Sequence, residues 1–177
     1  MKDNQKRILE LLDRHGESLH RLLSRLTRCE HSTSDLMQEL FIRLSCGRGF
    51  AKALNPYAYA WKTAANLAFE WRRKQKITFE CLEAAVVSDG SNQQTLEQMI
   101  EEEEFNRVLH AVSGLNELAR NVIVMRFMEQ KSYQEIAERL GKNPDYLRSL
   151  CSKTLERLRS IMNKEMSAYT NNEVSNG

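Results

Sequence analysis

Two helices joined by a very short turn are predicted by the stretch Ser132-Tyr133-Gln134-Glu135-Ile136-Ala137-Glu138-Arg139-Leu140-Gly141-Lys142-Asn143-Pro144. Ser132 and Glu135 have the spacing of a capping box, in which each side chain accepts a backbone N–H of the other residue. Gly141 can adopt the left-handed conformation that ends a helix. Asn143 is a favourable N-cap and Pro144 suits the first helical position, so a second helix is expected to begin there.

Helices connected this tightly cross at a steep angle, which is typical of the helix-turn-helix of DNA-binding proteins. The second helix of this pair carries a polar and basic set suited to a DNA groove: Tyr146, Arg148, Ser149, Ser152, Lys153, Arg157 and Arg159. Two capped helices in succession also occur in ordinary helical bundles, so plain packing is the alternative reading of this stretch alone.

The composition favours an all-α protein, because only 7 glycines and 2 prolines interrupt its 177 residues. No apolar run is long enough to cross a bilayer, and the first residues lack the apolar segment of a signal peptide. We therefore expect a cytoplasmic protein without membrane insertion.

Neither a metal site, nor a cofactor, nor enzymatic activity is expected. The 4 cysteines stand far apart without the paired spacing of a zinc site, and Cys29-Glu30-His31 offers no second ligand pair. No Gly-rich phosphate loop and no Ser/His/Asp set stands out.

Charge is unevenly distributed along the chain, although the net charge is only +2. Residues 1–77 carry +7, residues 78–105 carry −8, and residues 106–166 carry +4. Two basic blocks separated by an acidic spacer indicate two modules that both meet a polyanion, the alternative being solvated helix faces.

The basic N-terminal block is expected to form helices. Apolar residues recur at helical spacing and predict one long helix over 4–28, which Gly16 weakens and can bend or split. Ser32 and Asp35 predict the start of a helix over 33–45, and a loop over 45–55 follows. Asn55-Pro56 repeats the helix start of Asn143-Pro144 and opens a helix to about Lys76. One face of that helix is apolar, and another carries Tyr59, Lys62, Asn66 and Arg73.

The remaining chain predicts a flexible linker and a second helical domain. The four glutamates 101–104 are expected to open a helix, because negative charge is favourable at a helix N-terminus. Another helix is expected over 116–129, and the last helix should end near Lys164. We therefore predict two small helical domains and a disordered tail, with the divisions 1–77, 78–100 (linker), 101–165 and 166–177.

Three segments together resemble an extracytoplasmic-function (ECF) sigma factor, the small two-domain class of bacterial transcription initiation subunit. Residues 34–44 (SDLMQELFIRL) resemble the family's signature in its first domain, and residues 60–68 (AWKTAANLA) resemble the segment that contacts the minus-ten promoter element. Residues 132–141 resemble the helix-turn-helix that reads the minus-thirty-five element. The resemblance covers roughly residues 5–162.

The resemblance implies a role for particular residues. Asp35, Gln38 and Glu39 would dock core RNA polymerase. The residues that would meet minus-ten DNA, with Asn66 contacting a flipped base beneath the loop 45–55, are Tyr59, Lys62, Asn66, Arg72, Arg73, Lys74 and Lys76. Those that would meet the minus-thirty-five element are Tyr146, Arg148, Ser149, Leu150, Ser152 and Lys153. An anti-sigma factor is an implied further partner.

The chain departs from the family pattern at two positions. Gln130 stands where glycine is frequent in the turn before the helix-turn-helix, and Leu150 stands where a basic residue is frequent. We expect a promoter-specificity subunit that directs core polymerase to promoters and assists their melting. The alternative functions are a stand-alone helix-turn-helix regulator and a helical protein-interaction module.

Overall fold

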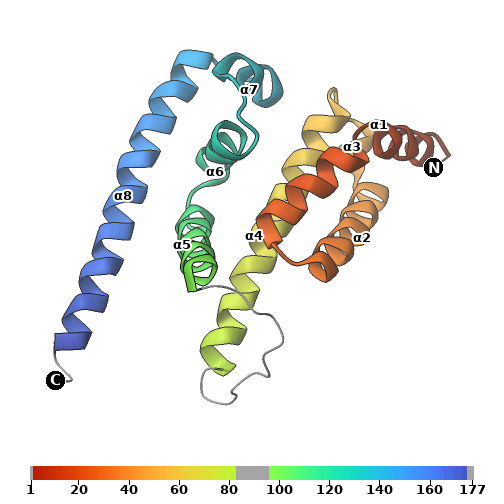
Figure 1. The fold of residues 1–177 in the computed structure, drawn as a ribbon. Coiled ribbons are helices and arrows are strands. Elements are labelled where there is room, and N and C mark those ends of the chain that lie inside the picture. Colours follow the sequence, from red (N-terminus) through yellow and green to blue (C-terminus); the bar gives the residue numbers. More distant parts are fainter. Residues whose placement is uncertain (1, 83–95, 175–177) are drawn as a thin grey trace. The chain divides into compact units, whose positions relative to one another are not determined.

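The computed structural model describes residues 2–82 and 96–174, which fall into two compact units, Met1–Thr78 and Phe79–Gly177 (Figure 1). Side chains are described for residues 4–75, 97, 100 and 101–164. Every regular element in these residues is a helix, so the all-α prediction is confirmed.

The N-terminal unit contains α1 (Lys2–Thr27), α2 (Glu30–Cys46), the short α3 (Arg48–Ala51) and most of α4 (Pro56–Leu82), which extends past the boundary at Thr78. As predicted, α1 is one helix, and Gly16 does not split it. The core of this unit consists of leucines of α1 and α2, the alanines of α4, and Trp61 and Phe69, which are both fully buried. Each large apolar side chain buried in this way contributes about 1.5–3 kcal/mol.

The start of α2 differs from the prediction, which placed it at Ser32 with Asp35. Arg28 has φ 53° and ends α1, and Cys29 is extended, so α2 begins at Glu30. The Thr33 hydroxyl donates to the Cys29 carbonyl at 2.8 Å, and it lies 2.8 Å from the Thr27 hydroxyl in a buried pair. This pair ties the end of α1 to the first turn of α2, which begins without a side-chain cap.

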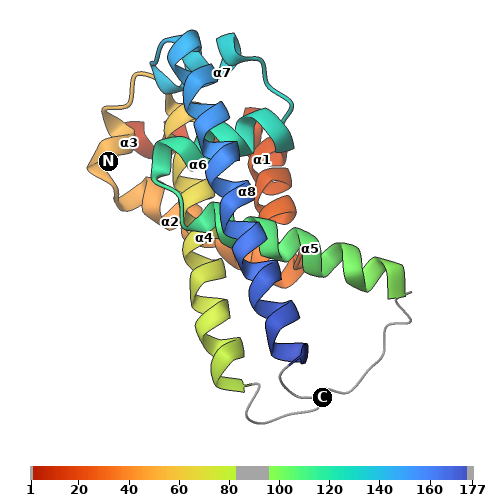
Figure 2. The same cartoon turned by 90° about the vertical axis from the view of Figure 1, so that its left-hand side faces the viewer.

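The C-terminal unit contains α5 (Leu96–Ser113), α6 (Glu117–Ile123), the π-helical turn η1 (Val124–Met128), α7 (Tyr133–Leu140) and α8 (Pro144–Val174). Its core joins α5, α6 and η1 to the buried side chains of Ile136 in α7 and Leu147 in α8. The single unbroken course of α8 is visible in Figure 2.

Several helices are longer than the sequence indicated. α4 continues to Leu82 and α5 begins at Leu96, so helix occupies both ends of the expected linker 78–100, and residues 83–95 lie outside the described residues. The four glutamates 101–104 lie inside α5 rather than opening it. α8 reaches Val174 where a disordered tail from 166 was expected, because no glycine or proline interrupts that stretch.

The backbone conformation of the turn before α7 shows why glycine suits the position of Gln130. Gln130 has φ 56°, a left-handed conformation that costs a residue with a Cβ about 1–2 kcal/mol. Glycine adopts this conformation freely, although it loses more conformational entropy on folding.

We therefore expect Gln130→Gly to stabilise the protein by about 0.5–1 kcal/mol, the relief of strain less the entropic cost of glycine. Urea unfolding of the full chain measures this change. Gln130→Ala is the control, since alanine keeps the Cβ and should give no gain. A less stable glycine variant would contradict the strain argument.

Candidate nucleic-acid interface

The helix-turn-helix has the predicted caps. The Ser132 hydroxyl accepts the Glu135 backbone N–H at 3.2 Å, and the Glu135 carboxylate accepts the Ser132 N–H at 2.7 Å. Together with the neighbouring Lys131 ammonium, these bonds hold the pKa of Glu135 down at about 2, so its charge is present throughout the physiological range. Gly141 is left-handed with φ 64°, and Asn143 Oδ1 accepts the N–H groups of Asp145 and Tyr146 at 2.9 and 3.2 Å.

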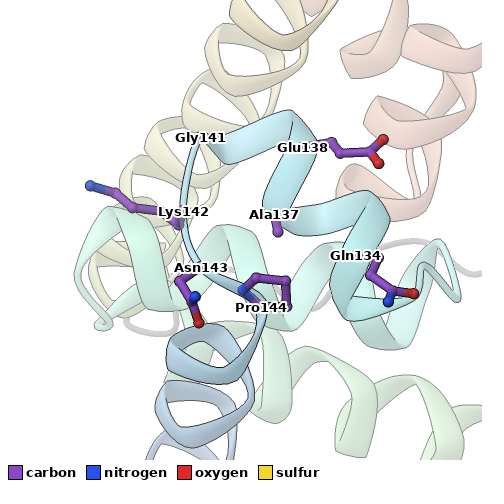
Figure 3. Close-up of a pocket in the computed structure, with 7 residues that line it drawn as sticks. All are labelled: Gln134, Ala137, Glu138, Gly141, Lys142, Asn143 and Pro144. Atoms are coloured by element: carbon purple, nitrogen blue, oxygen red, sulfur yellow. The ribbon is translucent and has the colours of Figure 1, made fainter.

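A shallow hollow of about 560 Å³ lies where α7 turns into α8 (Figure 3). It is lined by polar and apolar residues of α7, the turn and the start of α8: Gln134, Ala137, Glu138, Gly141, Lys142, Asn143 and Pro144. The hollow is open, and none of its charged residues is buried. It is therefore better suited to contact the surface of a macromolecule than to enclose a small ligand.

The candidate minus-thirty-five residues lie at the start of α8. Tyr146, Arg148, Ser149, Ser152 and Lys153 are exposed, whereas Leu150 is half-buried. The opposite face of α8 packs into the core through Leu147, Cys151 and Leu158, as expected, and Leu155 is half-buried. This division leaves the exposed face available to a DNA groove.

The candidate minus-ten residues lie on α4. Lys62, Arg73 and Lys74 are exposed, and Tyr59 and Asn66 are half-buried. The separations of Tyr59, Lys62, Asn66 and Arg73 place these four on one helical face. Lys76 belongs to α4, but its side chain lies outside the described residues.

Arg72 differs from its basic neighbours because it is half-buried. Its Nε donates to the Leu26 carbonyl, one of the free carbonyls at the end of α1. Burial, with a contribution from nearby Arg28, lowers the pKa of Arg72 to about 10, so it remains a cation at neutral pH. The guanidinium therefore has a structural partner within the unit.

The segment between α2 and α4 is partly helical, where a loop was expected over 45–55. It contains α3, whose Phe50 is fully buried, and Arg7 of α1 donates to the carbonyls of Ala51 and Ala53 at 2.7 and 3.0 Å. Asn55 caps α4 by accepting the Ala58 N–H at 3.0 Å. Burial of Phe50, the hydrogen bonds from Arg7 and the Asn55 cap thus all stabilise this segment.

Tyr59 is the point at which this segment meets the candidate DNA-binding face. A Cβ built on Gly49 would stand 2.6 Å from the Tyr59 hydroxyl oxygen, and the ring of Phe50 lies 6.1 Å from the ring of Tyr59. The segment therefore packs directly against the face of α4 at Tyr59.

The candidate docking residues lie on α2. The Asp35 carboxylate lies 3.5 Å from Nε2 of His31. The Glu39 carboxylate accepts a hydrogen bond from Nε of Arg43 at 2.9 Å, and Nη2 of Arg43 lies 3.1 Å from the Glu70 carboxylate. Gln38 is exposed. Ile42 is 53% exposed and lies on the same face of α2, one turn beyond Gln38 and Glu39. The candidate docking face therefore includes an apolar side chain to which the sequence analysis gave no role.

Among the described side chains, no group of three or more His, Cys, Asp or Glu residues could hold a metal ion. Cys29, Cys46 and Cys151 are free thiols, and Cys81 lies outside the described side chains. None of the described helices has the length and apolarity needed to span a membrane.

Two family models match this chain, one in each unit. The model of Sigma-70 region 2 matches residues 11–77, and the model of Sigma-70, region 4, matches residues 111–160. The chain is an ECF sigma factor of the sigma-70 family. Sigma factors are in general non-catalytic regulatory subunits, and this sigma factor directs core RNA polymerase to promoters. The stand-alone regulator and the interaction module are thereby set aside.

One curated protein and one solved structure are similar to this chain. The ECF RNA polymerase sigma factor SigX of Bacillus subtilis (strain 168) is 25% identical over 158 residues, which span 86% of this chain and 81% of SigX. A co-crystal structure of the sigma factor RpoE in complex with the anti-sigma factor NepR from Bartonella quintana has a TM-score of 0.48 and 17% identity, over 92% of this chain and 98% of that one.

The contact between Gly49 and Tyr59 can be tested directly in this sigma factor. We expect Gly49→Ala to destabilise the protein by about 1–2 kcal/mol, because overpacking against the ring outweighs the better helix propensity of alanine. Adding Tyr59→Phe removes the clashing oxygen and should recover part of the loss. Thermal unfolding of the single and double variants measures both effects.

Gly16→Ala is the matched control for Gly49→Ala. Gly16 lies inside α1, where an added Cβ would meet only Leu12 Cβ at 4.0 Å. This change should stabilise the protein by about 1 kcal/mol, the difference in helix propensity. Equal gains at both glycines would contradict the close contact with Tyr59.

Proposed function

We propose that the N-terminal unit docks core polymerase through α2 and captures minus-ten DNA on α4, assisting promoter melting, while α8 reads the minus-thirty-five element. The observation that carries this proposal is the exposed polar and basic face of α4 beside a segment fixed to Tyr59. A fixed surface loses little conformational entropy when it binds, which favours capture of an unstacked base.

The docking proposal concerns Asp35, Gln38 and Glu39 of α2. Carboxylates and an amide along one exposed helix face complement a basic partner surface. The exposed Ile42, one helical turn beyond Gln38 and Glu39, adds apolar area that is removed from water when a partner covers it. Glu39 would exchange part of its pairing with Arg43 for the partner.

The minus-ten proposal gives different tasks to the side chains of α4. Asn66 carries an amide that can donate to and accept from a base edge. Tyr59 offers an aromatic ring against which a base can stack. Lys62, Arg73 and Lys74, with Lys76, would bind phosphates and so supply affinity without sequence choice. Arg72 would contribute its charge while it holds the end of α1.

The minus-thirty-five proposal assigns base-edge contacts to the exposed start of α8 through Tyr146, Arg148, Ser149, Ser152 and Lys153. Leu150, which is half-buried, can offer only an apolar contact, for example to a thymine methyl group. The chain would have no catalytic activity of its own and would act in the cytoplasm, where an anti-sigma factor would compete for it.

Transcription on promoter DNA by bacterial core polymerase, with and without this protein, tests the proposal as a whole. We expect initiation at a discrete start only when the protein is present. Permanganate footprinting of thymines in the same reactions reports whether the minus-ten region is opened. Initiation without a protein-dependent open region would remove the melting assignment.

The docking surface predicts a loss of core binding. Asp35→Ala combined with Glu39→Ala should weaken the affinity for core polymerase by about 10-fold or more, because two charge-complementary contacts are removed. Glu10→Ala combined with Glu17→Ala is the matched control, since it removes two exposed glutamates from i,i+4 pairs on α1. Equal affinity of both double variants would defeat the docking assignment.

The base-capture surface predicts a selective defect in promoter opening. Asn66→Ala should slow open-complex formation more than it weakens closed-complex binding, because its amide would meet the base only after flipping. Gln75→Ala removes an exposed amide on the opposite side of α4 and should have no effect. Stopped-flow fluorescence of a labelled promoter separates the two steps, and an equal loss in both would count against base capture.

A further inference from the structure

Tyr133, the first residue of α7, has two arginines against its ring. The guanidinium carbon of Arg126, from η1, lies 5.2 Å from the ring centroid, and that of Arg148, from α8, lies 5.5 Å from it. Both distances are within the range of a cation–π contact. One ring therefore links the π-helical turn, the first helix of the helix-turn-helix and the second.

The ring itself is held in place. It is half-buried at the capped start of α7, directly after Ser132. A side-chain hydrogen bond with Cys151, which is buried in α8, raises the pKa of the Tyr133 hydroxyl together with burial. Arg126 is fixed in turn, because its guanidinium donates to the Lys131 carbonyl at 3.0 Å.

Arg148 is the exposed member of the group. Its side chain is 66% exposed, and its guanidinium lies 3.3 Å from the exposed carboxylate of Asp145. An arginine on an exposed helix face normally samples many rotamers, and binding must suppress them. A ring beneath the guanidinium restricts this sampling before any ligand arrives.

We propose that Tyr133 is a positioning residue, which holds the Arg148 guanidinium ready for the edge of a guanine in the major groove of the minus-thirty-five element. This inference rests on the proposed role of α8. Guanine is the base that a planar, stacked guanidinium recognises with two parallel hydrogen bonds, to O6 and N7. A phosphate could also bind Arg148, but such a contact would not depend on the base sequence.

Promoter binding by the reconstituted holoenzyme tests the proposal, with a duplex panel that varies each base pair of the minus-thirty-five element. Arg148→Ala should cost about 10-fold or more on the preferred sequence and relax the choice of one G·C pair. Tyr133→Leu should cost roughly 3- to 5-fold and relax the same pair, whereas Tyr133→Phe, which keeps the ring, should bind like the wild type. Tyr133→Leu should add no further loss to Arg148→Ala.

Additive losses in the double variant would overturn the proposal, and so would a loss in Tyr133→Leu that is uniform over all sequences. Wild-type affinity of Arg148→Ala would instead remove the proposed role of Arg148 in DNA reading, and with it the task assigned to Tyr133. Core binding by each variant serves as the control for folding, and Tyr133→Met is a second variant without a ring.

A measurement on the free wild-type protein keeps the ring contact testable if the variants without a ring do not fold. The δ-protons of Arg148 should show an upfield ring-current shift in the NMR spectrum, and the Arg148 Nε–H should be more ordered than that of the exposed Arg157. Random-coil shifts and equal disorder would contradict the positioning role without any reference to DNA.

Discussion

The rotational setting of four helices in this protein depends on how their first N–H groups are satisfied. α4, α6, α7 and α8 all begin at a residue whose side-chain oxygen accepts a backbone N–H, namely Asn55, Asn116, Ser132 and Asn143. Such a cap fixes where the helix starts, and the start fixes which residues face the core and which face solvent. The faces of α4 and α8 proposed to meet DNA therefore follow from two asparagines, each followed by a proline.

Much of the helix-turn-helix could be predicted from the sequence, because its determinants are local. The capping box and the left-handed Gly141 depend on residues that are close in the chain, and the structure confirms both. The start of α2 was predicted wrongly, since the buried contact between the hydroxyls of Thr27 and Thr33 joins two helices and leaves no local pattern. Helix ends without glycine or proline were likewise placed too early.

The environment of the site residues was harder to predict. The sequence does not distinguish a basic side chain that faces solvent from one that binds the carbonyls at a helix end. Arg72 follows the helical spacing of a phosphate-binding cation, yet its guanidinium reaches the Leu26 carbonyl at the end of α1. Tyr133 belongs to the motif that indicated the fold, but its place against Arg126 and Arg148 arises only when η1, α7 and α8 pack together. Three-dimensional proximity of this kind has no signal in a single sequence.

The π-helical turn η1 sets the rotational position of the helices that follow it in the C-terminal unit. The Glu129 N–H donates to the Val124 carbonyl five residues earlier, at 3.2 Å, so this turn holds one residue more than an α-helical hydrogen bond would enclose. Loss of that residue could restore a regular α-helix while rotating everything beyond it by about 100°. The extra residue in η1 therefore sets the direction in which the chain enters α7, independently of the side-chain caps of α7 and α8.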